Sequence, residues 1–217
     1  GVKGTAASNE VAGAAVATGD FDADGFDDVA IGAPAATIGT RRAAGEVIVV
    51  YGSDDGLLPD PRSQWLTSDR IGANGVASES GDQFGASLAV GDFDADGFDD
   101  LVVGAPGEGV GAAAVAGAVT VFPGSATGID RAAGRELRAD GAMAGDAEAG
   151  DRLGVALAAG DVNGDDVDDL AVGIPGEDTV AGAERAGDAG AVLVVLGRRA
   201  TAVSPGLRPS GSRELAM

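Results

Sequence analysis

The chain has 217 residues, of which 14 are basic and 35 acidic, giving a formal net charge of −21, and it contains neither His nor Cys. The missing Cys excludes disulfide frameworks, thiol nucleophiles and thiolate metal centres, and the missing His excludes Ser-His-Asp triads and imidazole metal sites. The negative charge argues against nucleic acid or an anionic membrane as partner and favours cations. No apolar run approaches the ~20 residues of a membrane-spanning helix, so we expect no membrane insertion.

An Asp-rich segment occurs three times. Residues 19–28 (GDFDADGFDD) recur unchanged at 91–100 and return in altered form at 160–169. Each copy continues into an apolar run that ends in Gly-x-Pro, with the Pro 14 residues after the first Asp of the copy. A loop of variable length follows, and then a Gly-x-Val run that is closed by Gly. These closing runs occupy residues 45–52, 117–124 and 190–197.

Further apolar runs complete a repeating unit. One precedes each acidic segment, as at residues 84–90 and 153–159, and a weaker one follows the closing run at 63–67 and 135–138. Runs of this length, bounded by Gly, Pro and Asp, are typical of strands rather than helices. Four short strands in each unit of about 70 residues are typical of propeller blades. The sequence therefore predicts an all-β fold of three four-stranded antiparallel blades without helices.

The second acidic turn has the ligand spacing of a calcium loop. Asp92, Asp94 and Asp96 stand at positions one, three and five, Gly97 at position six, and Asp100 at position nine. The Gly permits the positive φ that reverses the chain. The carbonyl of position seven then faces inward and the carboxylate at nine closes a cage of hard oxygen ligands, as Ca²⁺ requires. Without a cation, each pair of carboxylates about 4 Å apart repels by ~1–4 kcal/mol.

Two alternatives compete with the calcium interpretation. An EF-hand needs a carboxylate at position twelve, but that position holds Ile31, Val103 and Val172, all in apolar runs. Solvated Asp-Gly turns are the second alternative, since both residues favour turns; three copies at a fixed distance from the following Pro argue against it. In the third turn, Asn163 keeps an oxygen donor at position three and Asp166 replaces the Gly at six. We expect this site to bind more weakly.

The motifs resemble a known family. Phe84-Gly85, the acidic turn at 92–100 and Gly104-Ala105-Pro106 are similar to the FG-GAP repeat, the blade of the integrin α-chain propeller and of many secreted bacterial proteins. The resemblance covers residues 9–197 and implies four-stranded antiparallel blades with Ca²⁺ in the hairpin between the first two strands. It implies about three Ca²⁺ sites, whose ligands are Asp20, Asp22, Asp24, the Phe26 carbonyl and Asp28; Asp92, Asp94, Asp96, the Phe98 carbonyl and Asp100; and Asp161, Asn163, Asp165, the Val167 carbonyl and Asp169.

Three blades cannot close a ring, because propellers use roughly 4–8 blades. We expect a propeller segment over residues 1–203, with blades at about 9–70, 81–140 and 150–203, and a flexible tail or linker over 204–217. The open ends predict further blades in a longer chain, association of copies into a homo-oligomeric ring, or an open arc. These alternatives stay open on the sequence.

Other residues receive less specific roles. The Asp-Asp doublets that close the acidic turns are interpreted as one ligand and one outward-facing residue, since neighbouring strand residues point to opposite faces. Trp65 is expected to pack in an outer strand. The loop at residues 176–190 is the longest after a Gly-x-Pro motif, so it is the first place to seek a partner surface.

We expect a calcium-binding extracellular module for ligand binding or cell adhesion, not an enzyme, because no nucleophile and base are paired in any motif. The sequence does not name the protein or glycan ligand, and it gives no reason to expect nucleic acid. The alternatives are an accessory propeller segment of a secreted hydrolase and a purely structural unit that oligomerises.

Overall fold

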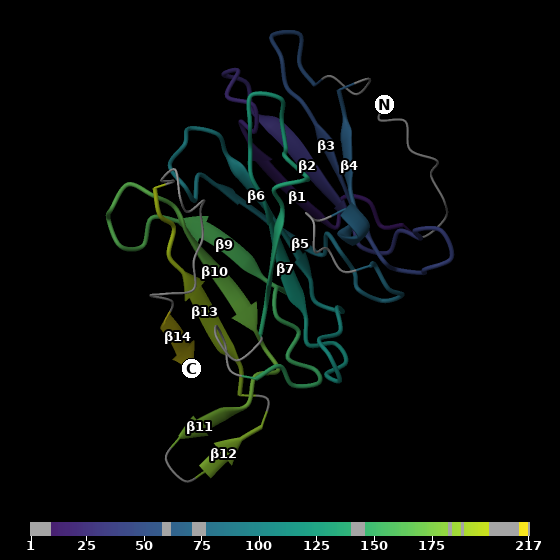
Figure 1. Cartoon of the computed structure of the whole chain (residues 1–217), viewed down its shortest axis with the longest axis vertical. Helices are drawn as coiled ribbons and strands as arrows, with labels where there is room; N and C mark the ends of the chain where they lie inside the picture. Colours follow the sequence, from purple (N-terminus) through teal and green to yellow (C-terminus); the bar gives the residue numbers. More distant parts are fainter. Residues whose placement is uncertain are drawn as a thin grey trace.

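Three four-stranded antiparallel sheets follow one another along the chain in the computed structural model, which describes residues 10–57, 62–70, 77–139, 146–181, 184–187, 189–199 and 213–216 (Figure 1). Each sheet is one repeat of the sequence, so the predicted all-β fold of four-stranded blades is confirmed. In the described part of the chain, the 3₁₀ turn Ser68–Arg70 is the only helical element. No helix there is long and apolar enough to cross a bilayer.

The first two blades are simple meanders in chain order. The strands of the first are β1 (Ala15–Gly19), β2 (Asp28–Ala33), β3 (Glu46–Val50) and β4 (Gln64–Leu66). The strands of the second are β5 (Ser87–Gly91), β6 (Asp100–Ala105), β7 (Ala118–Phe122) and β8 (Arg135–Arg138). Every acidic turn joins the first two strands of its blade, so each turn lies at the same end of its sheet.

The third blade takes its outer strand from the predicted tail. It contains β9 (Leu157–Gly160), β10 (Asp169–Ile174), β13 (Ala191–Val195) and β14 (Arg213–Ala216). Because β14 pairs antiparallel with β13, from Ala191↔Ala216 to Val194↔Arg213, the prediction of a linker over 204–217 is corrected for residues 213–216. Residues 204–212 and 217 lie outside the described residues.

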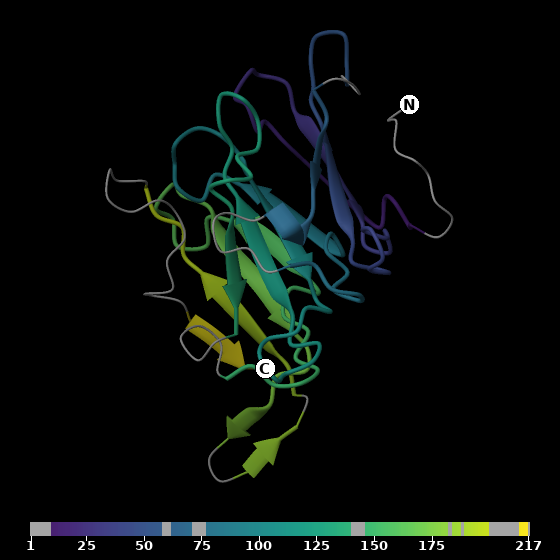
Figure 2. The same cartoon turned by 45° about the vertical axis from the view of Figure 1, so that its right-hand side comes forward.

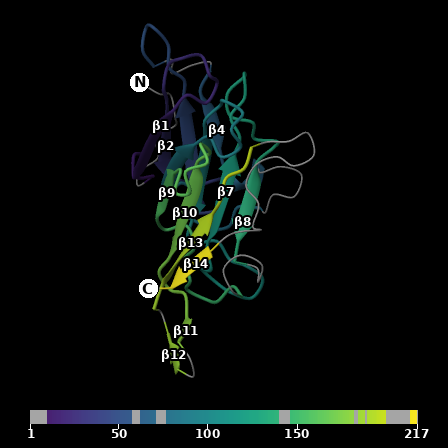
Figure 3. The ribbon, with the colours of Figure 1, turned by 90° about the vertical axis from the view of Figure 1, so that its left-hand side faces the viewer.

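A small hairpin interrupts the third blade between β10 and β13. Its strands β11 (Thr179–Ala181) and β12 (Glu184–Ala186) pair with each other and with no blade. In three views the hairpin extends beyond the ends of the sheets (Figures 1, 2 and 3). It occupies part of the loop at 176–190 that the sequence singled out.

The hydrophobic core lies between blades rather than within one. One cluster joins the first and second blades and includes Phe21, Phe84 and Phe122; the other joins the second and third blades and includes Phe93 and Leu153. The rings of Phe84 and Phe122 meet edge to face at 6.2 Å. Strand β1 contacts β5, and β5 contacts β9, but the three blades do not close into a ring.

The central blade differs from its neighbours in burial. Every residue of β6 and β7 is buried, whereas β10 and β13 alternate between buried and half-buried residues. Strand β1 likewise alternates, with Val16 59 % exposed. Both faces of the central blade are therefore covered, whereas strands β1, β10 and β13 of the terminal blades keep partly exposed residues.

Candidate metal centre

The three acidic turns share one backbone conformation. Gly25 and Gly97 at position six have φ of 93° and 91°, and Asp166 takes the same left-handed region at 63°. In the first turn, the carboxylate of Asp20 accepts the N–H groups of Asp24 at 3.1 Å and Gly25 at 2.9 Å. The other two turns repeat these bonds. The replacement of Gly by Asp at position six in the third turn is thus accommodated without changing the loop.

The carboxylate at position nine anchors each turn to the blade. Asp28 is fully buried and accepts two backbone N–H groups, from Phe21 at 2.9 Å and from Gly52 at 2.8 Å. Asp100 and Asp169 bind the corresponding pairs of donors. These bonds fix the turn to the Gly that follows the third strand. Each oxygen of the residue predicted to close the cage still keeps a second lone pair for a further ligand.

Carboxylates converge in the first two turns. In the first, one oxygen each of Asp20, Asp22 and Asp28 lies within 4.8 Å of the others. In the second, a similar group forms from positions one, three and five, Asp92, Asp94 and Asp96, rather than from positions one, three and nine. The structure therefore brings together three of the four predicted carboxylates in each of these turns. Asp24 and Asp100 lie in their turns but not in these groups, and the roles of the Phe26 and Phe98 carbonyls stay predictions.

Two carboxylate oxygens in these clusters are buried without a partner. Asp22 and Asp94 are each 8 % exposed, and their Oδ1 atoms accept no hydrogen bond. A buried acceptor left unpaired costs about 1–3 kcal/mol, and more when it is charged. Position three is thus preorganised for a ligand that supplies positive charge, and this feature is present in both turns.

The electrostatics of the clusters favours neutralisation. Burial raises the pKa of Asp100 to about 8, although N–H groups of Gly124 and Phe93 partly oppose it. Burial likewise raises the pKa of Asp28 to about 6. Burial and the charges of Asp96 and Asp92 raise the pKa of Asp94. A divalent cation at the centre of each cluster would reverse these shifts by attracting the charged forms.

The first cluster already has one cation beside it. The guanidinium of Arg62 forms an ion pair with Asp22 Oδ2 and lies 5.2 Å from the centre of the Tyr51 ring. The residue at the corresponding place in the second repeat is Ala133, because Leu66 pairs with Val47 as Leu137 pairs with Val119. Arg62 was not identified from the sequence, because nothing in its local pattern links it to a turn 40 residues earlier.

The third turn is more exposed than the other two. Asp161, Asn163 and Asp165 are all exposed. Backbone N–H groups of Asp166, Gly164 and Asp165 outweigh desolvation and lower the pKa of Asp161. No converging group of three acidic side chains is found here among the described residues. The predicted ligands Asp161, Asn163, Asp165, the Val167 carbonyl and Asp169 therefore share a turn without being gathered as closely as in the first two.

The doublets contain a contact that the sequence analysis missed. Asp99, interpreted as outward-facing, accepts the N–H of Asp20 at 2.9 Å and donates its own N–H to the Asp20 carbonyl at 3.1 Å. Asp168 pairs with Asp92 in the same way. Position eight of one turn thus binds position one of the preceding turn, and the interpretation of these two residues was wrong.

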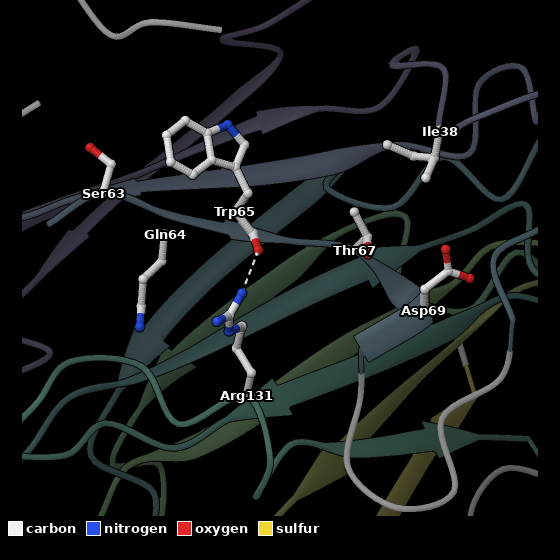
Figure 4. A pocket seen from close by; sticks show the side chains of 7 residues that line it. All are labelled: Ile38, Ser63, Gln64, Trp65, Thr67, Asp69 and Arg131. Carbon is white, nitrogen blue, oxygen red and sulfur yellow. Dashed lines mark hydrogen bonds between the residues drawn. The ribbon is translucent and has the colours of Figure 1, made fainter. Parts of the chain in front are cut away.

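A pocket of about 380 Å³ lies beside β4 (Figure 4). Trp65 lines it and is only partly buried, and Arg131 donates to the Trp65 carbonyl at 3.2 Å. Gln64 is already bonded to Tyr51 and Ile129, and Asp69 to Arg41. Because these polar groups have partners within the chain, we assign the pocket no ligand.

Comparison with known proteins agrees with this architecture. The model of the FG-GAP repeat matches residues 12–50, 84–122 and 153–195, which together make up more than half of the chain. The chain belongs to the FG-GAP repeat family. Each match begins at or next to the Phe-Gly position and ends in the third blade strand.

Relatives of two kinds share the repeats. Phosphatidylinositol-glycan-specific phospholipase D of Bos taurus is 35 % identical over 166 residues, which cover 75 % of this chain and 18 % of the relative. Integrin alpha-4 of Xenopus laevis is 31 % identical over 162 residues, covering 74 % and 14 %. Integrin alpha-PS5 of Drosophila melanogaster is 32 % identical over 173 residues, covering 79 % and 16 %. The chain thus spans less than a fifth of the length of these relatives.

Proposed function

We propose that this chain is a calcium-binding, non-catalytic propeller module of an extracellular protein, used to bind a protein or glycan ligand. The observation that carries the calcium assignment is the pair of buried, unpartnered Oδ1 atoms of Asp22 and Asp94, each inside a group of converging carboxylates. Hard oxygen ligands at this spacing suit Ca²⁺, with water completing the 6–8 ligands.

Calcium has a structural role in this proposal. The ion neutralises charges that burial penalises, and it joins the hairpin between the first two strands to the rest of the blade. A site filled at 100 times its dissociation constant adds about 2.7 kcal/mol of stability. Two or three such sites are comparable with the whole stability of a domain, about 5–15 kcal/mol. Extracellular modules use weak sites that fill at millimolar calcium, which supports an extracellular location.

Ligand binding is proposed from the architecture and from the integrin relatives. The hairpin β11–β12 extends beyond the blades, and loops on a rigid scaffold commonly carry recognition. Arrays of immobilised glycans and matrix proteins probe this role directly. We expect retention of the chain in millimolar calcium and its loss when a Gly-Ser linker replaces residues 179–186. Absence of retention in calcium would contradict the ligand-binding role.

Thermal unfolding tests the calcium assignment. We expect the melting temperature to fall by more than about 10 °C when calcium is exchanged for chelator, since loss of two sites removes roughly 5 kcal/mol. Magnesium restores less, because it demands near-ideal octahedral geometry. The double variant Asp22→Ala/Asp94→Ala loses most of the response to calcium. The matched control is Asp54→Ala, which removes an exposed carboxylate outside the turns and keeps the full response.

A second candidate function follows from the phospholipase D relatives: the chain is the accessory propeller segment of a secreted hydrolase. No motif of this chain pairs a nucleophile with a base, so in this proposal the hydrolytic chemistry belongs to another part of such a protein. Incubation of the calcium-loaded chain with bis(p-nitrophenyl) phosphate, p-nitrophenyl acetate and p-nitrophenyl glycosides checks this point. We expect no hydrolysis above buffer; turnover that survives repurification would contradict the non-catalytic assignment.

A further inference from the structure

Both blade junctions in the chain place an Asp of the later blade on the acidic turn of the earlier blade. At the first junction, Asp99 Oδ2 accepts the N–H of Asp20 at 2.9 Å, and the Asp99 N–H donates to the Asp20 carbonyl at 3.1 Å. At the second, Asp168 makes the same two bonds with Asp92, at 3.1 and 3.3 Å. Asp20 and Asp92 stand at position one and belong to the two groups of converging carboxylates. The next blade therefore holds the backbone of a candidate calcium ligand.

A third bond from the next blade fixes position two of the same turns. The Ser125 N–H donates to the Phe21 carbonyl at 3.1 Å, and the Arg198 N–H donates to the Phe93 carbonyl at 2.9 Å. The side chains of both Phe residues are fully buried. Positions one and two lead directly into position three, where a buried Oδ1 accepts no hydrogen bond. The backbone before that oxygen is thus held by three bonds from the next blade.

The Gly that precedes position one is required by this contact. A Cβ added at Gly19 would lie 2.4 Å from Val90 Cγ1 and 2.7 Å from Asp99 Oδ2. A Cβ added at Gly91 would lie 2.7 Å from Asp168 Oδ2. Neither Gly lies in the left-handed region of φ, so the close approach of the next blade, rather than a turn conformation, excludes a side chain there. Both junctions are therefore built around the contact between position eight and the preceding turn.

The carboxylates of the first cluster are anchored in two different blades. Asp28 at position nine is bound within its own blade, where it accepts the Gly52 N–H at 2.8 Å. Asp20 at position one is bound on its backbone by Asp99 of the next blade. The distance between these two carboxylates thus depends on the docking of the two blades as well as on the loop between them.

We propose that Asp99 and Asp168 are positioning residues for calcium: each holds position one of the preceding turn, so that the first and second sites are complete only when two consecutive blades are docked. This inference rests on the proposed calcium function. Groups that hold a metal ligand from outside the coordination shell change metal affinity by about 10–100-fold when they are removed. By linkage, calcium that binds the docked arrangement more tightly also strengthens the junction between the blades.

The alternative is that position eight supports its own turn, since Asp99 directly precedes Asp100 at position nine. The two interpretations assign the effect of one substitution to different calcium sites, so the sites must be measured separately. The double variant Asp94→Ala/Asp161→Ala retains only the first site. The double variant Asp22→Ala/Asp161→Ala retains only the second.

Calorimetric titration of Ca²⁺ into the 217-residue chain, in these two backgrounds, tests the proposal. We expect Asp99→Ala to lower the calcium affinity of the first site by about tenfold or more and to leave the second site unchanged. Asp168→Ala lowers the affinity of the second site by a similar factor. The matched control is Asp27→Ala, which removes the exposed carboxylate at position eight of the first turn and leaves the first site unchanged.

Asp99→Asn separates the position of the ligand from the charge beside it. The Asn side chain keeps an oxygen that can accept the Asp20 N–H, so this variant should regain most of the affinity that Asp99→Ala loses. An Asn variant that loses as much affinity as the Ala variant would assign the effect to the charge and overturn the positioning role.

Thermal unfolding supplies a readout that a merely structural contact would not change. Asp99→Ala should lower the melting temperature more in saturating calcium than in chelator, because the variant binds the ion more weakly in the folded state. A contact that only joins the two blades would give the same loss in both conditions.

The titrations also distinguish failure of this inference from failure of the proposed function. If neither background binds calcium, the proposed function is wrong and the inference falls with it. If calcium binds, then equal losses at both sites, a loss at the second site alone, or no loss at either site in Asp99→Ala overturns the inference only. Circular dichroism in calcium verifies that each variant is folded. Where Asp99→Ala is unfolded, Asp168→Ala at the second junction and Asp99→Gln, which displaces the acceptor by one methylene, make the same test.

Discussion

The first two acidic turns and the third have the same backbone but different surroundings. The next blade covers the first two, and its Asp99 or Asp168 binds the residue at position one; their carboxylates converge and Asp22 and Asp94 are buried. Among the residues that the structure describes, no further blade covers the third turn, and its residues 161–166 are exposed. The comparison indicates that the loop sequence sets the backbone, while blade packing creates the buried, charged cage.

The largest expected effect is a difference in the free energy of unfolding: stability is lost when position two of a covered turn is replaced and kept when position two of the uncovered turn is replaced. Phe93→Ala removes a fully buried ring between two blades and is expected to cost about 3–5 kcal/mol. Val162→Ala, at the equivalent exposed position, changes the free energy of unfolding by less than about 0.5 kcal/mol. Urea denaturation at low protein concentration measures both. Equal losses would contradict the claim that only the first two turns are covered.

The pH dependence of stability should have a contribution from the central blade that the first blade lacks. Burial, together with the charges of Asp82 and Glu136, raises the pKa of Glu108 to about 7, against the opposing charge of Arg138. The folded chain therefore binds this proton more tightly than the unfolded chain. The resulting stability is complete below about pH 4.5 and is lost as the pH rises through 7.

The shift corresponds to at most about 3 kcal/mol. Glu108→Gln should remove this part of the pH dependence. The first blade has Ala36 at the same place, so Ala36→Ser is the control and leaves the profile unchanged. Denaturation midpoints between pH 4.5 and 8 measure the pH dependence of stability for each variant. Identical profiles for wild type and Glu108→Gln would contradict the role given to Glu108.

Replacing the carboxylate at position three should change the free energy of unfolding in opposite directions in calcium and in chelator. In calcium, Asp94→Ala removes one site and about 2.7 kcal/mol at 100 times the dissociation constant. In chelator, the same change removes a buried, unpartnered carboxylate oxygen and should stabilise the chain by about 1 kcal/mol. Asn163→Ala, in the exposed turn, should show neither effect at that size. Melting of both variants in calcium and in chelator reveals whether the sign reverses.

The smallest expected effect is a change in calcium affinity at the first turn that the second turn does not show. Arg62 is 44 % exposed and pairs with Asp22, so the pair contributes no more than about 1 kcal/mol. Because calcium must compete with this guanidinium, Arg62→Ala should raise the calcium affinity of the first site by up to about fivefold. Affinity at the second site, which has Ala133 at the equivalent place, should not change. Calorimetric titration in an Asp94→Ala background follows the first site without the second, and titration in an Asp22→Ala background follows the second site without the first.

Much of the fold was predictable because the repeat places Gly, Pro and Asp at constant intervals, which defines strands and turns without any long-range information. The strand β14 was missed because Pro and Gly in the preceding segment indicate a linker, and only pairing with β13 orders residues 213–216. The roles of Asp99 and Arg62 were missed for a different reason. Their partners lie 79 and 40 residues earlier, so tertiary packing alone makes the contacts.

Equilibrium dialysis against ⁴⁵Ca²⁺ at millimolar concentration tests the central claim most directly, because it counts ions on the folded chain. The account predicts two sites that disappear in Asp22→Ala/Asp94→Ala, together with a third, weaker site that depends on Asp161. A folded chain that retains no calcium under these conditions, or one whose bound calcium is unaffected by both substitutions, would contradict it.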